Sequence, residues 1–452
     1  MNHHAQPERR FGLLQATALN MSNMLGAGPF ITIPLLMASM VGPQSMLGWG
    51  VALIVALADG LVWSELGAAL QKSGGSYVYL REGYGREKWG RFMGFLFIWQ
   101  FLISGPLELA SGYAAAANYL QPFWPESSEL TRKSAGMVVG LLMILLLYRK
   151  IEAVGKLMIA LWAGSLLAMG VVIFTGVMHF DAKLAFDFPK DAWTFDATKW
   201  VALGAAARIG IYDYLGYYDI CFIGDEVKQP GRVIPRAVML SLVLVAVIYF
   251  AVNLSIIGVV PWREFVSTEG VNKPVVTMMM TKIYGSDFAQ LFTVLVLWTM
   301  VACCFAMLLG YSRIPYAAAR DGSFFRVFGR LHPQMGFPHV SLIVIGLIAA
   351  AATFVQLDTL INGLLTTRIV VQFAGQIGAL VILRRVQPEM ERPFRMWLYP
   401  LPALLALVGW AYLLVTTEHM LLVYGALALL AGCGVFLVWS WRSHVWPFSH
   451  EK

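Results

Sequence analysis

One stretch of the chain carries residues suited to binding a small ionised molecule. It runs from Asn20 to Phe30, inside an apolar run that extends from 11 to 40. A run of this length can cross a bilayer, which takes about 20 residues. Gly26 and Gly28 lower helix propensity, while Pro29 disfavours helix at Gly28 and is well suited to be the first residue of a new helix. We therefore predict two half-helices joined by an unwound hinge at Gly26, Ala27 and Gly28.

The chemistry expected at this hinge is the binding of an anion. An unwound backbone is tolerated within a membrane only where it is buried in protein or lines a cavity. The free amides at the start of the second half-helix form a positive dipole end, which suits a carboxylate. The alternative is a glycine and proline kink that only packs against a neighbouring helix.

A second apolar run, 200–222, is interrupted by the sequence Tyr-Asp-Tyr-Leu-Gly-Tyr-Tyr from 212 to 218. The interruption places Tyr212, Asp213, Tyr214 and Gly216 at the middle of the run. Tyrosines are also common at membrane interfaces, but a position near the middle of a span argues against that interpretation. These four residues are therefore candidates for the same binding site as the hinge.

Several ionisable residues lie inside apolar runs, where a charge costs about 2.5–3.5 kcal/mol and marks a candidate functional site. Lys156 can alternatively extend its amine to the nearby polar boundary. The carboxylates can alternatively form static pairs with buried arginines, and the sequence leaves this pairing open. The residues concerned are Asp59, Glu65, Glu108, Lys156, Arg208 and Arg368.

The elements that position these residues follow from composition. Of the 452 residues, 58% are hydrophobic and 13% are charged, whereas a soluble domain has about 25% charged residues. The chain is therefore predicted to be an all-α polytopic membrane protein forming one domain, 1–452. Twelve apolar spans are expected at 11–40, 45–70, 91–120, 134–147, 152–177, 200–222, 236–260, 287–319, 340–355, 358–383, 397–415 and 420–441.

Spans one and six, the two interrupted spans, each begin a group of five. The second group must be inverted relative to the first, which predicts repeats at 11–177 and 200–383 followed by two additional helices at 397–441. Paired interrupted spans in such a repeat indicate a substrate site near the bilayer midplane.

Charge predicts the orientation and excludes several classes of protein. With the N-terminus in the cytoplasm, most of the 33 lysines and arginines lie in cytoplasmic loops, as the positive-inside rule requires. We expect a multi-pass protein of the cytoplasmic (inner) membrane with both termini inside. The basic residues are spread over loops, which does not suggest nucleic-acid binding, and no phosphate-binding loop is present for driving by ATP.

The cysteines and histidines suggest neither a metal, a cofactor nor an enzyme. Cys221, Cys303, Cys304 and Cys433 all lie in apolar runs without a CxxC pattern, so neither a disulfide nor a metal site is expected. An enzyme would need a nucleophile paired with a base, or a metal cluster, and the histidines lie in loops or tails.

Four motifs together resemble those of the amino acid–polyamine–organocation superfamily, most closely bacterial amino-acid permeases related to the L-type transporters. The resemblance covers spans one to ten. The motifs are Gly26-Ala27-Gly28, the tyrosines Tyr77 and Tyr79 after Ser73-Gly74-Gly75, the segment from Asp225 to Pro235, and Ser312-Arg313 with Ala319-Arg320-Asp321-Gly322.

This resemblance implies the LeuT-type fold, in which the hinge amides hold a substrate carboxylate and hinge carbonyls of spans one and six hold its ammonium. Pro29 departs from the family pattern and should stiffen the break. Tyr212 falls at the place of a gating aromatic residue. Asp213 falls where the family often has a small residue, which argues against a simple neutral pocket.

The resemblance also suggests residues for coupling and pocket shape. A lysine at the place of Lys156 looks like a substitute for a bound sodium ion, bridging spans one and eight. Glu108 and Cys303 are further coupling candidates. Pro106 and Phe305 are expected to line the pocket, with Phe305 narrowing it or, alternatively, packing toward lipid.

The function predicted is secondary active transport of amino acids by alternating access, sodium-independent and driven by proton symport or exchange. A cationic amino-acid or polyamine transporter, favoured by Glu108 and Asp213, is one alternative. A non-transporting receptor or scaffold on the same fold is another. The expected partners are the amino acid and the lipid bilayer. No disulfide-linked subunit is expected, because loop 121–133, where eukaryotic L-type relatives carry the linking cysteine, has none.

Overall fold

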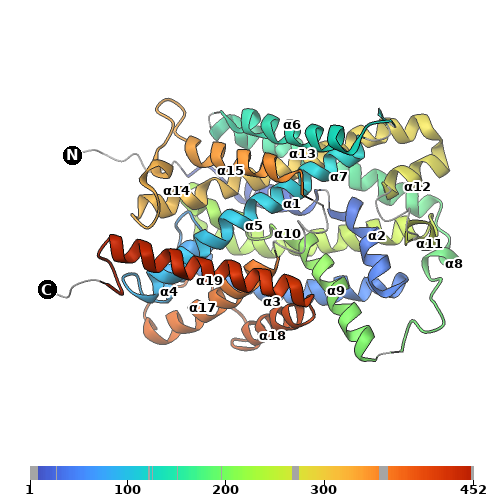
Figure 1. The fold of residues 1–452 in the computed structure, drawn as a ribbon. Coiled ribbons are helices and arrows are strands. Elements are labelled where there is room, and N and C mark those ends of the chain that lie inside the picture. The colour runs from blue at the N-terminus through green and yellow to red at the C-terminus, as the bar shows by residue number, and fades with distance from the viewer. Residues whose placement is uncertain are drawn as a thin grey trace.

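The computed structural model of the chain describes residues 9–26, 28–120, 123–124, 126–149, 151–194, 196–266, 274–355 and 365–448. Within these ranges the secondary structure is helical, apart from an isolated β-bridge between Phe11 and Val227. The long helices run side by side, with α4, α14 and α17 near one end of the molecule and α8, α11 and α12 near the other (Figure 1).

The elements are α1 (Leu13–Met24), α2 (Gly28–Met40), η1 (Pro43–Ser45), α3 (Met46–Ala69), α4 (Ser76–Gly83), α5 (Trp89–Tyr119), α6 (Glu129–Leu147), α7 (Ile151–Met178), α8 (Ala182–Ala185), α9 (Ala197–Tyr214), η3 (Asp219–Glu226), α10 (Pro230–Ile257), α11 (Trp262–Val266), α12 (Val275–Tyr284), α13 (Ser286–Tyr311), α14 (Arg313–Arg320), η4 (Arg326–Gly329), α15 (His339–Ala352), η5 (Ile369–Ala374), α17 (Gly375–Val386), α18 (Leu401–Val415) and α19 (His419–Arg442).

Length and apolar composition identify a polytopic membrane protein. In the described part of the chain, 8 helices are long and apolar enough to cross a membrane, or 9 if α1 and α2 form one bent span. Helices α12, α15 and α18 are apolar but shorter. Each predicted span contains a helix or a broken pair, although 358–364 of the tenth span lies outside the described residues. The apolar helix α12 was not predicted from the sequence.

Both predicted breaks are present in the helices. α1 ends at Met24 and α2 begins at Gly28, with a bend of 43° between them. α9 ends at Tyr214, and the chain continues through a turn into the 3-10 helix η3 from Asp219. The hinge residue Ala27 lies outside the described residues. The chain therefore changes direction at the two places where glycine was expected to interrupt a span.

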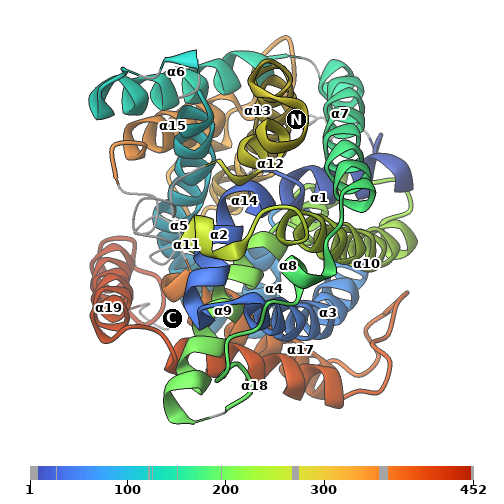
Figure 2. The same ribbon diagram turned by 90° about the vertical axis from the view of Figure 1, so that its right-hand side faces the viewer.

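The broken helices lie among the others, whereas the last helices lie outside. Figure 2, an end-on view, shows α2 near the centre and α6, α7, α18 and α19 toward the periphery. Of the span containing α5, 67% is buried, against 17% for α19 and 22% for α6. Helix α9 packs against α2 and α3, and α1 packs against α7, α10 and α13. The breaks are thus surrounded by protein, as an unwound backbone in a membrane requires.

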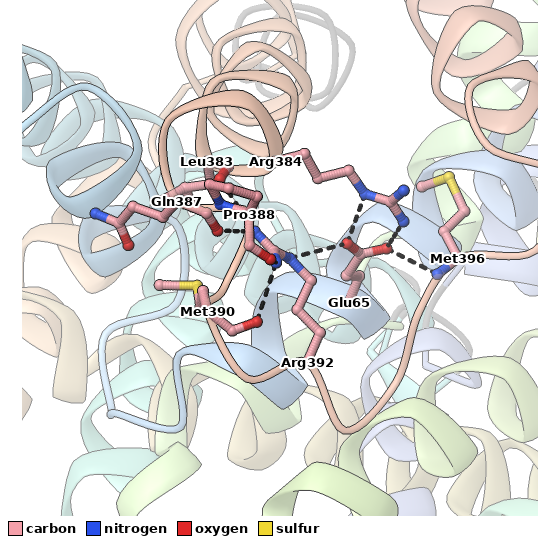
Figure 3. Close-up of polar contacts among 8 residues, drawn as sticks. All are labelled: Glu65, Leu383, Arg384, Gln387, Pro388, Met390, Arg392 and Met396. Atoms are coloured by element: carbon pink, nitrogen blue, oxygen red, sulfur yellow. Dashed lines mark hydrogen bonds and ion pairs between the residues drawn. The ribbon is translucent and has the colours of Figure 1, made fainter.

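Glu65 anchors the connection between α17 and α18 to the end of α3 (Figure 3). Its carboxylate accepts hydrogen bonds from the Arg384 guanidinium at 2.8 and 2.5 Å and from the Met396 amide at 2.7 Å. Arg392 Nε lies 3.6 Å away. The Arg392 guanidinium also donates to the carbonyls of Leu383, Gln387, Pro388 and Met390. Glu65, a candidate from its position in an apolar run, therefore has a structural partner set far from both breaks.

Glu65→Gln is expected to lower the stability of the folded protein. The side chain is 1% exposed, and removing its charge leaves two arginines without their counter-ion, which costs about 3 kcal/mol for a buried pair. Thermal unfolding in detergent measures the change. Glu82→Gln is the control, because Glu82 pairs with the half-exposed Arg86 and such pairs contribute less than about 1 kcal/mol. Equal unfolding temperatures for both variants would contradict the anchoring role.

Candidate functional site

A small cavity lies where the two helix breaks meet. Its volume of about 20 Å³ is enough for a single water molecule. Its walls come from α1, α2, α5, α9 and α13 and the turn after α9. The lining residues are Asn23, Met24, Gly28, Glu108, Gly112, Tyr212, Asp213, Leu215, Cys303 and Met307. Five residues chosen from the sequence thus meet at one cavity, namely Gly28, Glu108, Tyr212, Asp213 and Cys303.

Two asparagines of α1 hold the second break. The Asn20 amide donates to the Tyr217 carbonyl at 2.5 Å, and its oxygen accepts from the Ile220 amide at 3.0 Å. The Asn23 amide donates to the Asp219 carboxylate at 2.7 Å. Sequence reasoning missed these contacts. The only signal for them was the presence of two polar amides in an apolar span, next to the predicted hinge.

Gly26 is a glycine because α13 approaches the hinge closely. A Cβ atom at Gly26 would lie 2.3 Å from both Cβ and Sγ of Cys303. The Cys303 thiol donates a hydrogen bond of 3.0 Å to the Asn23 carbonyl near the end of α1. Cys303 therefore contacts the hinge directly and satisfies one of its backbone acceptors.

Gly28 lets the Asp213 side chain reach the start of α2. A Cβ atom at Gly28 would lie 2.5 Å from Asp213 Oδ1. Asp213 Oδ2 lies 2.7 Å from the Thr32 hydroxyl, which is also 2.8 Å from the Gly28 carbonyl. Asp213 is 2% exposed, and its Oδ1 has no hydrogen-bond partner among the described residues. A carboxylate of the protein itself thus lies beside the first turn of α2.

Gly216 shapes the second break. Its φ of +108° lies in a region that other residues rarely adopt, and a Cβ atom there would lie 2.4 Å from the Asn23 amide nitrogen.

Tyr214 is fully buried and packs against Tyr249, with 5.6 Å between ring centroids. The Tyr249 hydroxyl contacts the Met24 and Asp213 carbonyls, so α10 supports both helix ends. Tyr214 is near the site but does not line the cavity.

Tyr212 lines the cavity and is held by α5. Its hydroxyl lies 2.7 Å from the Ser111 hydroxyl. A buried tyrosine usually requires such a polar partner. Tyr212 therefore lies beside the cavity, whereas its action as a gate stays a prediction.

Glu108 is paired with Arg368. Arg368 NH1 lies 2.6 Å from Glu108 Oε2, and the Tyr311 hydroxyl donates to the same oxygen. Arg368 Nε donates to the Ser104 hydroxyl at 2.9 Å. The side chains of Glu108 and Arg368 are 4% and 1% exposed. Glu108 is therefore paired with Arg368, a pairing that the sequence left open.

The other buried ionisable groups have partners away from the cavity. Arg208 donates to the Thr416 carbonyl at 2.7 Å and to the Thr416 hydroxyl at 3.0 Å, at the carboxyl end of α18. A cation is favourable at that end of a helix. Asp59 accepts hydrogen bonds from Tyr217 at 2.5 Å and Trp63 at 2.9 Å. Neither residue contributes to the cavity wall.

Lys156 lies on the outer face of α7. Ala153, Lys156, Ala160 and Ala163 form one exposed stripe, while Met158, Leu161 and Ser165 face inward. In the described part of the chain, no hydrogen bond or ion pair joins Lys156 to α1 or α13. The geometry does not support a bridge between spans one and eight and fits the alternative of an amine that reaches the polar boundary. Coupling by Lys156 stays a prediction.

Pro106 and Phe305 are buried, but neither lines the cavity. Pro106 lies within α5, two residues before Glu108. Phe305 is fully buried in α13, so it does not face lipid. The cavity wall from these helices is formed by Gly112 and Met307 instead, which the sequence did not single out.

In secondary transporters, substrate sites lie where interrupted spans meet, and two interrupted spans of this chain meet at one buried cavity. The model of the family described as "Amino acid permease" matches residues 11–437. The chain therefore belongs to the amino acid permease family.

Known relatives are transporters rather than enzymes. The chain is 28% identical over 411 residues to the human "Cystine/glutamate transporter", covering 88% of this chain and 78% of that protein. It is 27% identical over 464 residues to the human "Asc-type amino acid transporter 1", covering 96% and 83%. An uncharacterised transporter of Mycobacterium tuberculosis is 29% identical over 358 residues, covering 76% and 73%.

Gly26→Ala is expected to destabilise the protein, because the new methyl group overlaps Cys303. Overpacking of this kind costs about 1–3 kcal/mol. Cys303→Gly in the same chain removes both atoms that the methyl group meets and should restore most of the loss. Cys303→Ala leaves Cβ in place and should not. Unfolding temperatures of the single and double variants in detergent measure the coupling, and equal rescue by Gly and Ala would contradict the close approach.

Proposed function

We propose that this chain is a secondary active transporter of amino acids, working by alternating access around the cavity between the two breaks. The observation that carries the proposal is the meeting of the α1–α2 and α9–η3 breaks at one buried cavity. Free backbone groups at such breaks can hold the charged ends of an amino acid. Membership of the amino acid permease family and the names of the relatives support the substrate class.

The fold proposed is the LeuT type, with twelve membrane helices in two inverted groups of five and two additional helices. The two interrupted spans support it, as do the 8 or 9 helices of the described residues that are long and apolar enough to cross a membrane. The distribution of lysine and arginine supports an inner-membrane location with both termini in the cytoplasm.

The substrate site proposed comprises the hinge residues Gly26, Ala27 and Gly28 with Tyr212, Asp213, Tyr214 and Gly216. Glu108 and Cys303 are proposed to act at the wall of the same cavity. The site has to widen before it can hold an amino acid, because a cavity of about 20 Å³ accommodates only water.

Sodium-independent transport by proton symport or exchange is proposed for the driving force. Sodium requires oxygen ligands, as other hard cations do. The Asn23 carbonyl, near the end of α1, accepts a hydrogen bond from the Cys303 thiol. This contact supports coupling without sodium, whereas the outward position of Lys156 does not contribute to the argument.

A cationic amino acid or a polyamine is the second candidate for the substrate, favoured by the unpaired oxygen of Asp213 beside the cavity. Glu108 no longer favours it, because its charge is neutralised by Arg368. A receptor without transport activity is the remaining alternative.

Uptake by purified protein in liposomes tests the function. Radiolabelled neutral, acidic and cationic amino acids and a polyamine are supplied in sodium and in choline buffer. We expect uptake of at least one amino acid at equal rates in both buffers. Gly28→Val should abolish it, because a Cβ at Gly28 meets Asp213 at 2.5 Å, whereas Gly50→Val should not, because nothing lies within 4 Å of a Cβ there. Binding without uptake would favour a receptor.

Tyr212→Phe should retain most transport, since the ring remains and only the hydrogen bond to Ser111 is lost. Tyr212→Ala removes the ring from the cavity wall and should lose most of it. Uptake normalised to folded protein separates gating from packing, because a tyrosine that only packs would give less folded protein with normal uptake per molecule. Near-native rates for both variants would exclude Tyr212 as the gate.

A further inference from the structure

The Thr32 hydroxyl lies between two oxygen atoms that normally act as acceptors. It is 2.8 Å from the Gly28 carbonyl and 2.7 Å from Asp213 Oδ2. A hydroxyl group has a single proton to donate. If Asp213 were ionised, the single Thr32 proton would have to be shared between the Gly28 carbonyl and Asp213 Oδ2, and each contact would be weaker than a full hydrogen bond. If Asp213 carries a proton, it donates to Thr32 and Thr32 donates to Gly28, so that both contacts are hydrogen bonds.

Among the described residues, no counter-ion is paired with the Asp213 carboxylate. On its own helix it is flanked by Tyr212 and Tyr214. The Tyr249 hydroxyl of α10 donates to its backbone carbonyl at 3.0 Å, not to its side chain. Across the cavity are Glu108 and Cys303.

The nearest arginines already have partners. Arg368 is paired with Glu108, and Arg208 is bound to the end of α18. In the described part of the chain, the side chain of Asp213 meets the start of α2, the Thr32 hydroxyl and the Trp49 indole of α3, none of which carries a charge. A buried carboxylate without a paired cation is expected to become neutral.

A substrate carboxylate would compete with Asp213 for the same place. The amides at the start of α2 attract one anion, and Asp213 Oδ1 already lies against Gly28, 2.5 Å from where a Cβ would be. Two carboxylates this close cannot both remain ionised, because like charges disfavour each other's charged form. A substrate with a carboxylate can therefore enter only when Asp213 holds a proton.

We propose that Asp213 is the proton-binding residue that couples proton and substrate movement in this transporter. The inference rests on the proposed function and adds to it the coupling group and the direction, namely symport. Water on one side supplies the proton to the Asp213 carboxylate, the substrate carboxylate then binds at the start of α2, and the carrier closes. On the other side the substrate leaves and Asp213 returns the proton to water.

Asp213→Asn separates coupling from transport. The amide has the shape of the protonated acid and can donate to Thr32 permanently. Liposomes are loaded with the amino acid that wild type transports, and two quantities are measured: exchange of labelled for unlabelled substrate, and accumulation driven by an acidic exterior. Wild type should accumulate up to about tenfold for each unit of pH difference. Asp213→Asn should lose accumulation, and whatever exchange it retains should no longer change with pH.

Asp59→Asn is the matched control. Asp59 is also fully buried with one unpartnered oxygen, but it does not line the cavity, so accumulation should persist. Accumulation by Asp213→Asn would overturn the proposal, as would exchange in wild type without any response to a pH gradient. In both cases the proposed transport function would stand. Absence of both uptake and exchange in wild type would instead contradict the function itself.

Thr32 gives a second test that does not depend on the Asp213 variant remaining folded. Thr32→Val removes the acceptor of the Asp213 proton, so uptake should become half-maximal about half to one unit lower in pH, the equivalent of one hydrogen bond. Thr32→Ser keeps the hydroxyl and should not shift the profile. A shift to higher pH, or none, would show that Thr32 does not accept this proton. Selective loss of cationic substrates in Asp213→Asn would indicate a substrate ammonium there instead and would likewise overturn the proposal.

Discussion

The structure depends on satisfying the backbone groups that two helix breaks leave free inside a membrane. Hydrocarbon offers no hydrogen bonds, so each such group needs a partner within the protein. In the second break, the Asn20 side chain donates a hydrogen bond to the Tyr217 carbonyl and accepts one from the Ile220 amide. The Tyr249 hydroxyl donates a hydrogen bond to the Met24 carbonyl at the end of α1. The second break is thus completed by a side chain of α1 and the first by a side chain of α10, so both breaks depend on neighbouring helices.

The two broken helices are also joined at one end of the molecule. The Phe11 amide donates to the Glu226 carbonyl at 2.9 Å, and the Lys228 amide donates to the Phe11 carbonyl at 2.8 Å. The segment before α1 is thus paired with the end of η3. Glu226 also accepts from Arg313 at 3.3 Å, at the start of α14. The two broken helices are therefore joined at this end as well as at their breaks, and any opening there has to separate them together from α14.

Local features of the sequence predicted the fold well, because glycine, proline and apolar length act within one segment. The breaks at Gly26–Gly28 and after Tyr214 are examples, and so is the position of Tyr212 at the cavity. Features that depend on distant residues could not be predicted. Glu108 and Arg368 are 260 positions apart, and nothing in either span indicates the other.

Lys156 shows a different limit of sequence reasoning. The residue was placed on the correct helix, but a bridging role depends on which face of α7 it occupies. An apolar helix in a membrane gives no strong periodicity for deciding this, since the faces toward lipid and toward protein are both apolar. The exposed stripe that contains Lys156 became visible only when the packing of α7 against α1 and α13 was known. Phe305 was similarly placed on the right helix, yet it lies outside the cavity wall.

Burial alone does not distinguish a functional carboxylate from a structural one in this protein. Asp59, Asp213 and Asp219 are all buried, and each has one oxygen without a partner among the described residues. Asp59 is held by Tyr217 and Trp63, and Asp219 is held by Asn23. Of the three, Asp213 is the one that lines the cavity. It also contacts the Thr32 hydroxyl, which lies close to a second acceptor, the Gly28 carbonyl. Since a carboxylate must exchange protons and meet a ligand in order to couple them, access to the cavity distinguishes Asp213 from the others.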